Sequence, residues 1–410
     1  MNHRRHRYLS IVVAVALALG WASCAAAIDF PATGQTTAYT ANKKDNITAP
    51  VAVPDDGTVQ AGATLSYTDN GDGTITDNNT GLMWEKKGDN GDLHDKDNGY
   101  PWSGTGTQET IWDWLDDINA EGGTGFAGYD DWRMPNAKEL QSLVNYQNAP
   151  PMTSAAFNSN CVAGATVLTG SCTTVGNYWS STTRAGSTSM AWGLSFYEGL
   201  LSPHDKASGV RVRAVRGGGS GLQDFPATGQ TTAYTANKND GIPGAVAVPD
   251  DGTVQAGAPM SFTDNGNGTI TDNNTLLVWE KKGDNGGLHD KDNNYWWSGN
   301  GADETIWDWL EDVNTEAFGG YQDWRVPNAR ELLSIADFEN RWAVPATFHN
   351  NCVPGATVLT GSCTLQVPYW TSTTQVSTGF TAWYVGTYGD VYPYFKSGTF
   401  RIRAVRGGTP

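Results

Sequence analysis

The sequence predicts an α+β protein made of two tandem copies of one domain. Its 410 residues carry a long internal repeat, because Asp29–Thr37 returns unchanged as Asp224–Thr232. Within each copy, glycine-rich turns separate many short β-forming segments, and only a few segments have helical spacing. We therefore expect each copy to contain short antiparallel strands, two helices and long loops.

The similarity between the copies continues to the C-terminal end. Thr68–Thr80 and Thr263–Thr275 agree at 12 of 13 positions. The offset between equivalent residues falls only from 195 to 190, so the insertions are few and small. We place copy 1 at 28–218, copy 2 at 223–410 and a Gly/Ser linker at 219–222, whose composition predicts flexibility.

A β-hairpin is predicted near the start of copy 1. The turn Asp69–Gly73 contains Asn-Gly and Asp-Gly and separates Leu65–Thr68 from Thr74–Thr76, which is the strongest short-range signal for a hairpin. Further strands are predicted at Leu82–Glu85, around Tyr178-Trp179, at Met190–Phe196 and at Val210–Val215.

Two helices are predicted in each copy. In copy 1, apolar residues recur at helical spacing from Ile111 to Ile118, with aspartates on the other face. A second helix is expected at Ala137–Val144, with Asn136 as its N-cap and Glu139 in its first turn.

The N-terminus and the net charge indicate an exported protein. Three arginines precede the apolar run Ile11–Leu19 and the small-residue site Ala25-Ala26-Ala27, which is the pattern of a signal peptide at 1–27. The run is too short for a transmembrane segment, and a periplasmic, cell-surface or extracellular location is expected. An imperfect lipobox leaves a lipid anchor on Cys24 as an alternative. The formal charge of −17 disfavours nucleic acid as a partner.

The cysteines predict one disulfide in each copy. Cys161 and Cys172 bound a segment that is identical at 11 of 12 positions to the one between Cys352 and Cys363. An even number of cysteines in an exported chain favours disulfides, and the spacing does not suit zinc.

An acidic loop in each copy is a candidate calcium site. Its carboxylates are Asp89, Asp92, Asp95 and Asp97 in copy 1 and Asp284, Asp290 and Asp292 in copy 2. Carboxylate and amide oxygens on a flexible loop suit Ca²⁺, although the spacing is not that of an EF-hand. The alternative is a solvated acidic loop stabilised by Asx turns.

No catalytic residues are predicted. His94 and His289 are shared by both copies, but neither has a paired nucleophile in sequence, so a structural hydrogen-bonding role is expected. Known hydrolase, metalloprotease and phosphate-binding motifs are absent from the sequence.

Aromatic residues in polar loops are candidate ligand-binding residues. They are Tyr100, Trp102, Tyr295, Trp296 and Trp297. Exposed aromatic side chains commonly stack on sugars or anchor a protein partner. The alternative is a loop that folds over a small hydrophobic cluster.

Several motifs resemble the Lcl C-terminal domain family, named after a bacterial collagen-like adhesin. They are Phe30–Thr36, Phe262–Asn273, Asp131–Leu140, Tyr178–Thr182 and Val212–Gly218. The resemblance covers nearly all of both copies and implies exported proteins, with adhesion and sulfated-glycan binding for the namesake. A looser resemblance links both copies to the C-type-lectin-like group, which includes formylglycine-generating enzymes.

Departures from these families limit what can be transferred. Ala38, Ala214, Ala233 and Ala404 stand where many family members carry cysteine, which suggests a lost disulfide. The catalytic cysteines of formylglycine-generating enzymes have no counterpart. We expect Arg133 with Glu139, and Arg325 with Glu331, to form buried structural ion pairs.

The sequence thus favours a non-enzymatic, exported module that binds a glycan or a surface protein. A structural envelope or appendage component and an enzyme of unknown reaction are the alternatives. The acidic charge argues for a neutral glycan or a protein rather than a sulfated glycan, unless Ca²⁺ bridges the two.

Overall fold

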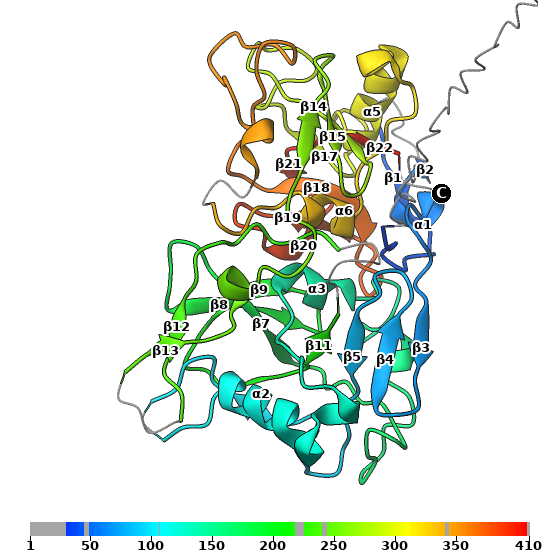
Figure 1. The fold of residues 1–410 in the computed structure, drawn as a ribbon. Helices are drawn as coiled ribbons and strands as arrows, with labels where there is room; N and C mark the ends of the chain where they lie inside the picture. The colour runs from blue at the N-terminus through cyan, green and yellow to red at the C-terminus, as the bar shows by residue number, and fades with distance from the viewer. Residues whose placement is uncertain are drawn as a thin grey trace, which may run out of the picture.

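The computed structural model describes residues 30–44, 49–105, 107–217, 225–239, 244–340 and 344–407. The predicted signal peptide, Cys24 and the predicted linker at 219–222 lie outside these residues. The two copies pack directly on one another, with the cyan and green elements of copy 1 below the yellow and red elements of copy 2 (Figure 1).

Both copies are α+β and share one order of elements. Copy 1 contains β1 (Thr40–Ala41), β2 (Val51–Ala52), α1 (Asp56–Val59), β3 (Tyr67–Asp69), β4 (Thr74–Asp77), β5 (Met83–Glu85), β6 (Gly99–Tyr100), α2 (Ile111–Ala120), α3 (Ala137–Ser142), β7 (Asn177–Thr183), β8 (Met190–Ser195), β9 (Leu201–Asp205), β10 (Val210–Arg211) and β11 (Val215–Arg216). Copy 2 contains β12 (Thr235–Ala236), β13 (Val246–Ala247), α4 (Asp251–Val254), β14 (Phe262–Asp264), β15 (Thr269–Asp272), β16 (Val278–Glu280), β17 (Tyr295–Trp296), α5 (Ile306–Thr315), α6 (Ala329–Ser334), β18 (Tyr369–Thr374), β19 (Thr381–Val385), β20 (Val391–Phe395), β21 (Thr399–Phe400) and β22 (Val405–Arg406).

The predicted hairpin and helices are confirmed. β3 and β4 pair with Asp69 opposite Ile75, across the Asn-Gly turn. α3 begins with the predicted capping box, in which Asn136 and Glu139 satisfy each other's backbone N–H groups. It ends at Ser142 rather than Val144. The predicted strand Val210–Val215 is two strands, β10 and β11, which belong to different sheets.

One sheet runs through both copies. Its eight strands follow the order β18-β19-β20-β9-β8-β7-β10-β6, and four-stranded sheets β11-β5-β4-β3 and β14-β15-β16-β22 flank it. The copies join where β20 pairs antiparallel with β9, at Val391 and Leu201. β9 is a strand that the sequence patterns did not predict.

One hydrophobic core also runs through both copies. The rings of Trp192 in copy 1 and Phe338 in copy 2 lie 5.2 Å apart, edge to face. Tyr146 and Trp383 form a similar pair at 5.0 Å. The copies are therefore packed into one body.

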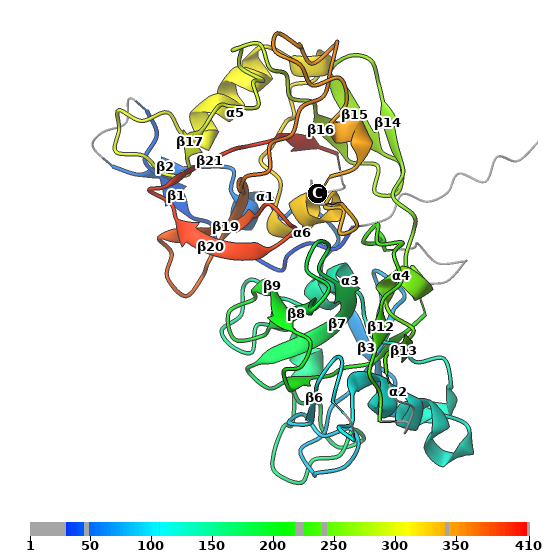
Figure 2. The same cartoon turned by 90° about the vertical axis from the view of Figure 1, so that its left-hand side faces the viewer.

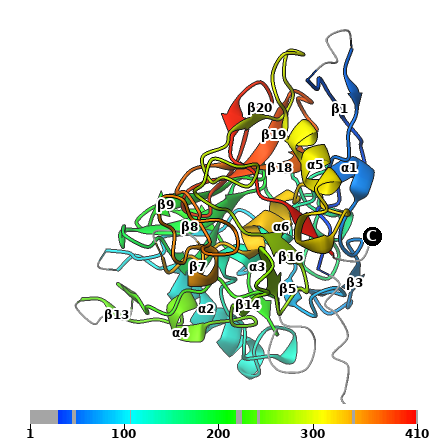
Figure 3. The same ribbon diagram turned by 90° about the horizontal axis from the view of Figure 1, so that it is seen from above.

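The N-terminal part of each copy packs on the other copy. We call residues 30–63 the first arm and residues 225–258 the second arm. The first arm carries the blue hairpin β1-β2 and lies beside α5 of copy 2, whereas β12-β13 lies beside α2 of copy 1, in both views (Figures 1 and 2). The view from above shows the same exchange (Figure 3).

Hydrogen bonds and core packing define this exchange. The backbone N–H of Asn42 donates to the hydroxyl of Ser298 at 2.9 Å, and that of Asn237 donates to Ser103 at 3.0 Å. Val53 of the first arm is buried in the cluster of Trp297, and Val248 of the second arm in the cluster of Trp102. The predicted boundaries 28–218 and 223–410 thus describe the repeat but not the packing units, since each unit contains the arm of the other copy.

Among the described residues, we find no helix with the length and apolar character needed to cross a membrane.

Candidate functional site

The expectation that Trp102 and Trp297 are exposed ligand-binding residues is wrong. Both side chains are 0% exposed. The indole N–H of Trp102 donates to the carbonyl oxygen of Ser180 at 3.2 Å, and its ring packs edge to face on Trp112. The polar loop therefore folds over a hydrophobic cluster, which was the alternative interpretation. The misleading signal was the polar sequence around a residue that points inward.

The remaining predicted aromatics differ in exposure. Tyr295 is only 6% exposed, whereas Tyr100 and Trp296 are partly exposed. Tyr295 lies opposite Phe400 in the β17-β21 ladder. It therefore connects the predicted region to a group of aromatic residues that the sequence patterns did not single out.

This group, the aromatic face, consists of Tyr384, Tyr392, Tyr394 and Phe400. Tyr384 lies directly opposite Tyr392 in the β19-β20 ladder, so the two side chains share one face of the sheet. Their rings stack with centroids 6.2 Å apart. The ring of Phe400 lies 4.9 Å from Tyr384 and 5.1 Å from Tyr394. Tyr394 is 46% exposed, and the other three are partly exposed.

Copy 1 lacks the aromatic face. The positions equivalent to its four residues hold Gly193, Ser202, His204 and Val210. Gly193 and Ser202 pair across β8 and β9 as Tyr384 and Tyr392 pair across β19 and β20. The backbone is thus the same and only the side chains differ. Comparing the two repeats position by position would have found this difference.

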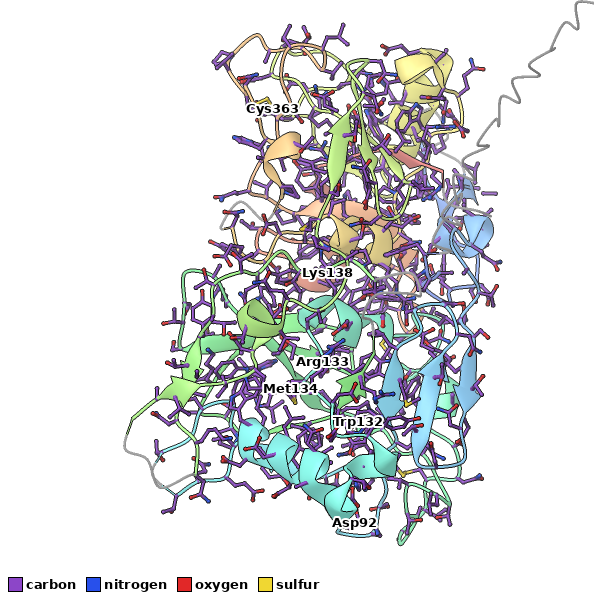
Figure 4. The ribbon with its side chains drawn as sticks, in the orientation of Figure 1. Asp92, Trp132, Arg133, Met134, Lys138 and Cys363 are labelled. Carbon is purple, nitrogen blue, oxygen red and sulfur yellow. A yellow bond between two sulfur atoms is a disulfide. The ribbon has the colours of Figure 1, made fainter. Side chains whose placement is uncertain are left out.

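The acidic loops bring three predicted carboxylates together in each copy. Oxygen atoms of Asp89, Asp95 and Asp97 lie within 4.8 Å of one another, and Asp284, Asp290 and Asp292 do the same. Asp92 is directed elsewhere, since it accepts a hydrogen bond from the backbone N–H of His94 at 2.8 Å. Asp92 lies at the end of copy 1 that is remote from copy 2, and Cys363 lies towards the opposite end of the molecule (Figure 4).

A lysine already supplies a positive charge to this cluster. The ammonium group of Lys96 lies 2.7 Å from both Asp89 and Asp97. Lys291 contacts Asp284 and Asp292 in the same way, at 2.9 and 2.6 Å. A calcium ion would have to displace this ammonium group, so the geometry favours the solvated acidic-loop alternative over a calcium site in the wild-type chain.

The two shared histidines connect the acidic loops to strands β5 and β16, through Glu85 and Glu280. His94 lies between Glu85 and Glu121, with its ring nitrogens 2.8 and 2.9 Å from their carboxylates. Burial lowers the pKa of His94, but hydrogen bonding and charge from Glu85 outweigh burial and raise the pKa above its usual value. Burial also raises the pKa of Glu280, yet Lys282 and His289 outweigh it and lower that pKa to about 2. These contacts fit the structural role expected for the histidines.

The predicted disulfides and ion pairs are confirmed. Cys161 bonds to Cys172 and Cys352 bonds to Cys363. The guanidinium group of Arg133 binds the carboxylate of Glu139 through two hydrogen bonds of 2.7 Å, and Arg325 binds Glu331 in the same way. The disulfides indicate an oxidising, exported environment.

The Lcl C-terminal domain model matches residues 73–216 and again residues 268–406. The chain belongs to the Lcl C-terminal domain family. A comparison with curated proteins found no match. Both Lcl C-terminal domain matches begin after the arms, so the exchanged segments lie outside the matched regions. The acidic loops and the aromatic face lie inside them.

Proposed function

We propose that this protein is an exported, non-catalytic module that binds a neutral glycan through the aromatic face of copy 2. The observation that supports this proposal is the set of four neighbouring aromatic rings on β19, β20 and β21, partly open to solvent. Ring faces on a rigid sheet suit the flat, apolar C–H faces of sugars.

The surroundings of the aromatic face also favour a glycan. Tyrosine hydroxyls can hydrogen-bond to sugar hydroxyls while the rings stack. Exposed apolar patches on soluble proteins commonly mark binding sites. Copy 1 offers glycine, serine and histidine at the matching strand positions, so we assign the site to copy 2 alone.

Charge favours a neutral ligand. The chain carries a formal charge of −17, and a sulfated glycan would meet a like-charged molecule. We therefore do not transfer the sulfated-glycan binding of the family's namesake to this chain. We also propose that each copy is related to the C-type-lectin-like group and that the protein acts in adhesion at the bacterial surface.

The test compares matched variants in the two copies. Tyr392→Ala/Tyr394→Ala removes rings from the aromatic face, and Ser202→Ala/His204→Ala changes the equivalent positions of copy 1. An array of neutral glycans identifies a ligand, and calorimetry measures its affinity for each protein. We expect the tyrosine variant to bind at least about tenfold more weakly, equivalent to about 1.4 kcal/mol, with the copy 1 variant unchanged.

Two results would contradict the proposal. If the wild-type protein binds no neutral glycan, the glycan assignment is wrong, and a protein partner or a structural role becomes the better account. If the tyrosine variant retains full affinity, the site lies elsewhere.

A further inference from the structure

The two arms agree at 29 of 34 positions and make equivalent contacts with the copy that receives them. Asp29–Thr37 and Asp224–Thr232 are identical. In the first arm, the carboxylate of Asp56 accepts hydrogen bonds from Thr33 of the same arm and from Thr373 of copy 2, both at 2.7 Å. In the second arm, Asp251 makes the same pair of bonds with Thr228 and with Thr182 of copy 1, at 2.6 and 2.7 Å. We call the surface that receives an arm the groove of that copy; it includes Trp297, Ser298 and Thr373 in copy 2, and Trp102, Ser103 and Thr182 in copy 1. Each groove therefore holds its arm through equivalent contacts.

Each arm also has the same rigid shape. A Cβ atom at Gly57 would lie 1.9 Å from the carbonyl oxygen of Thr37, and one at Gly252 would lie 1.9 Å from that of Thr232. Only glycine permits this close approach of the chain to itself. The close approach at Gly57 and at Gly252 is therefore made within the arm itself and does not depend on the groove.

In each groove, a tyrosine of the arm covers a lysine that lies over a buried tryptophan. In copy 2, the ammonium group of Lys396 lies 3.7 Å from the centre of the Trp297 ring and 4.7 Å from that of Tyr39 in the first arm. In copy 1, Lys206 lies in the same way between Trp102 and Tyr234 of the second arm, at 3.5 and 5.2 Å. Without an arm, the hydrophobic cluster around each tryptophan would lose part of its cover.

The contacts of the groove do not identify which chain donates the arm. The second arm follows copy 1 directly in sequence and packs on it, whereas copy 2 receives the first arm, which precedes copy 1. The first arm is also bound to its own copy 1, where the backbone N–H of Tyr146 donates to the carbonyl oxygen of Thr33 at 3.0 Å and the side chain of Gln147 accepts from the N–H of Thr36 at 2.8 Å. The arm of the same chain is favoured by its high effective concentration. Within the described parts of the arms and grooves, no contact depends on which chain the arm comes from.

We propose that copy 2 also accepts the first arm of a second copy of this chain, so that molecules join through exchanged arms. Donor arm and acceptor groove are different surfaces. The contact is therefore head to tail, and repeating it generates a closed ring or an extended assembly. This inference does not depend on the aromatic face.

A mixing experiment with full-length mature chains tests the proposal. One variant carries Asn42→Cys in the arm, and a second carries Ser298→Cys in the groove, where the Asn42 backbone and the Ser298 hydroxyl are in contact. The two variants, with different tags, are produced together and then oxidised. Since neither chain can form the new disulfide by itself, we expect a disulfide-linked heterodimer that increases several-fold with protein concentration.

Two controls make the result decisive. The double variant Asn42→Cys/Ser298→Cys should cross-link within one chain, which shows that the geometry allows the disulfide. Asn42→Cys mixed with Asp130→Cys, at an exposed position outside the groove, measures random cross-linking. If the double variant cross-links while the mixed single variants yield no more dimer than this control, exchange between chains is overturned.

Discussion

The carboxylate of Asp56 accepts a hydrogen bond of 2.7 Å from the hydroxyl of Thr373, although 317 residues separate the two in sequence. The bond attaches the first arm to β18 of copy 2. Asp251 and Thr182 form the equivalent bond between the second arm and β7 of copy 1. This pair of contacts makes the stability of each copy depend on the other.

The buried aspartates should make stability decrease as pH rises. Burial raises the pKa of Asp56 and of Asp251 to about 7, against the lowering effect of their threonine hydrogen bonds. The folded protein therefore keeps protons that the unfolded chain releases above about pH 4. We expect the free energy of unfolding to fall between about pH 4 and pH 7, and Asp56→Asn/Asp251→Asn to flatten this dependence.

Urea denaturation of both proteins at several pH values measures this effect. Asp130→Asn removes an exposed carboxylate and serves as the control. Equal pH dependence in the wild type and the double variant would show that these aspartates are not responsible.

Lys138 should stabilise the boundary between the copies, where Figure 4 shows it. Its ammonium group donates to the carbonyl oxygens of Ala227 and Ser334, at 2.8 and 2.7 Å, and the latter ends α6. Lys138→Met leaves both oxygens without this donor, and we expect a loss of about 1–3 kcal/mol in urea denaturation.

Arginine is the matched control at this position. Arg330, the equivalent residue of copy 2, donates to the carbonyl oxygens of Ser142 and Val144 at 2.8 Å. Lys138→Arg should therefore cost less stability than Lys138→Met. The opposite order would argue against the hydrogen bonds as the source of the effect.

Replacing a buried aromatic residue should reduce the free energy of unfolding far more than replacing an exposed one. Trp297 is completely buried, so we expect Trp297→Ala to cost about 3–5 kcal/mol, since it leaves a cavity beneath the first arm. Tyr394→Ala changes a largely exposed ring and should change stability by no more than about 0.5 kcal/mol. Thermal or urea denaturation distinguishes the two, and a small effect at Trp297 would contradict its assignment to the core.

Calcium binding should depend on the lysine within each acidic cluster. Because Lys96 and Lys291 neutralise the carboxylates, we expect excess calcium to leave the Tm of the wild-type protein unchanged. Lys96→Gln/Lys291→Gln removes the competing charge, and calcium should then raise the Tm. Magnesium is the control, because it accepts such loop geometries less readily. An increase in the Tm of the wild type with calcium would instead support a calcium site in the native loop.

The disulfides should stabilise the folded protein, and all four of their cysteines should be oxidised. Cys161→Ala/Cys172→Ala opens a short loop, and we expect a loss of about 3 kcal/mol. Thiol titration of the denatured, unreduced mature chain should find no free thiol. Detection of thiols in a chain that lacks Cys24 would contradict the pairing.

Local features of this protein were determined by its sequence alone. The hairpin at Asp69–Gly73, the capping box of Asn136 and Glu139, and the disulfides all join residues that are near in sequence. Their formation depends on turn chemistry, capping and short loop closure, which a sequence displays directly. The ion pair between Arg133 and Glu139 was predictable for the same reason.

Only the tertiary structure decided which arm completes which copy. The two arms agree at 29 of 34 positions, so packing on the same copy and packing on the other copy would give the same repeat pattern in sequence. Likewise, the burial of Trp102 and the exposure of Tyr394 depend on which strands and loops cover them. Such long-range packing leaves no local signal, because it is determined by surfaces that meet only after the chain has folded.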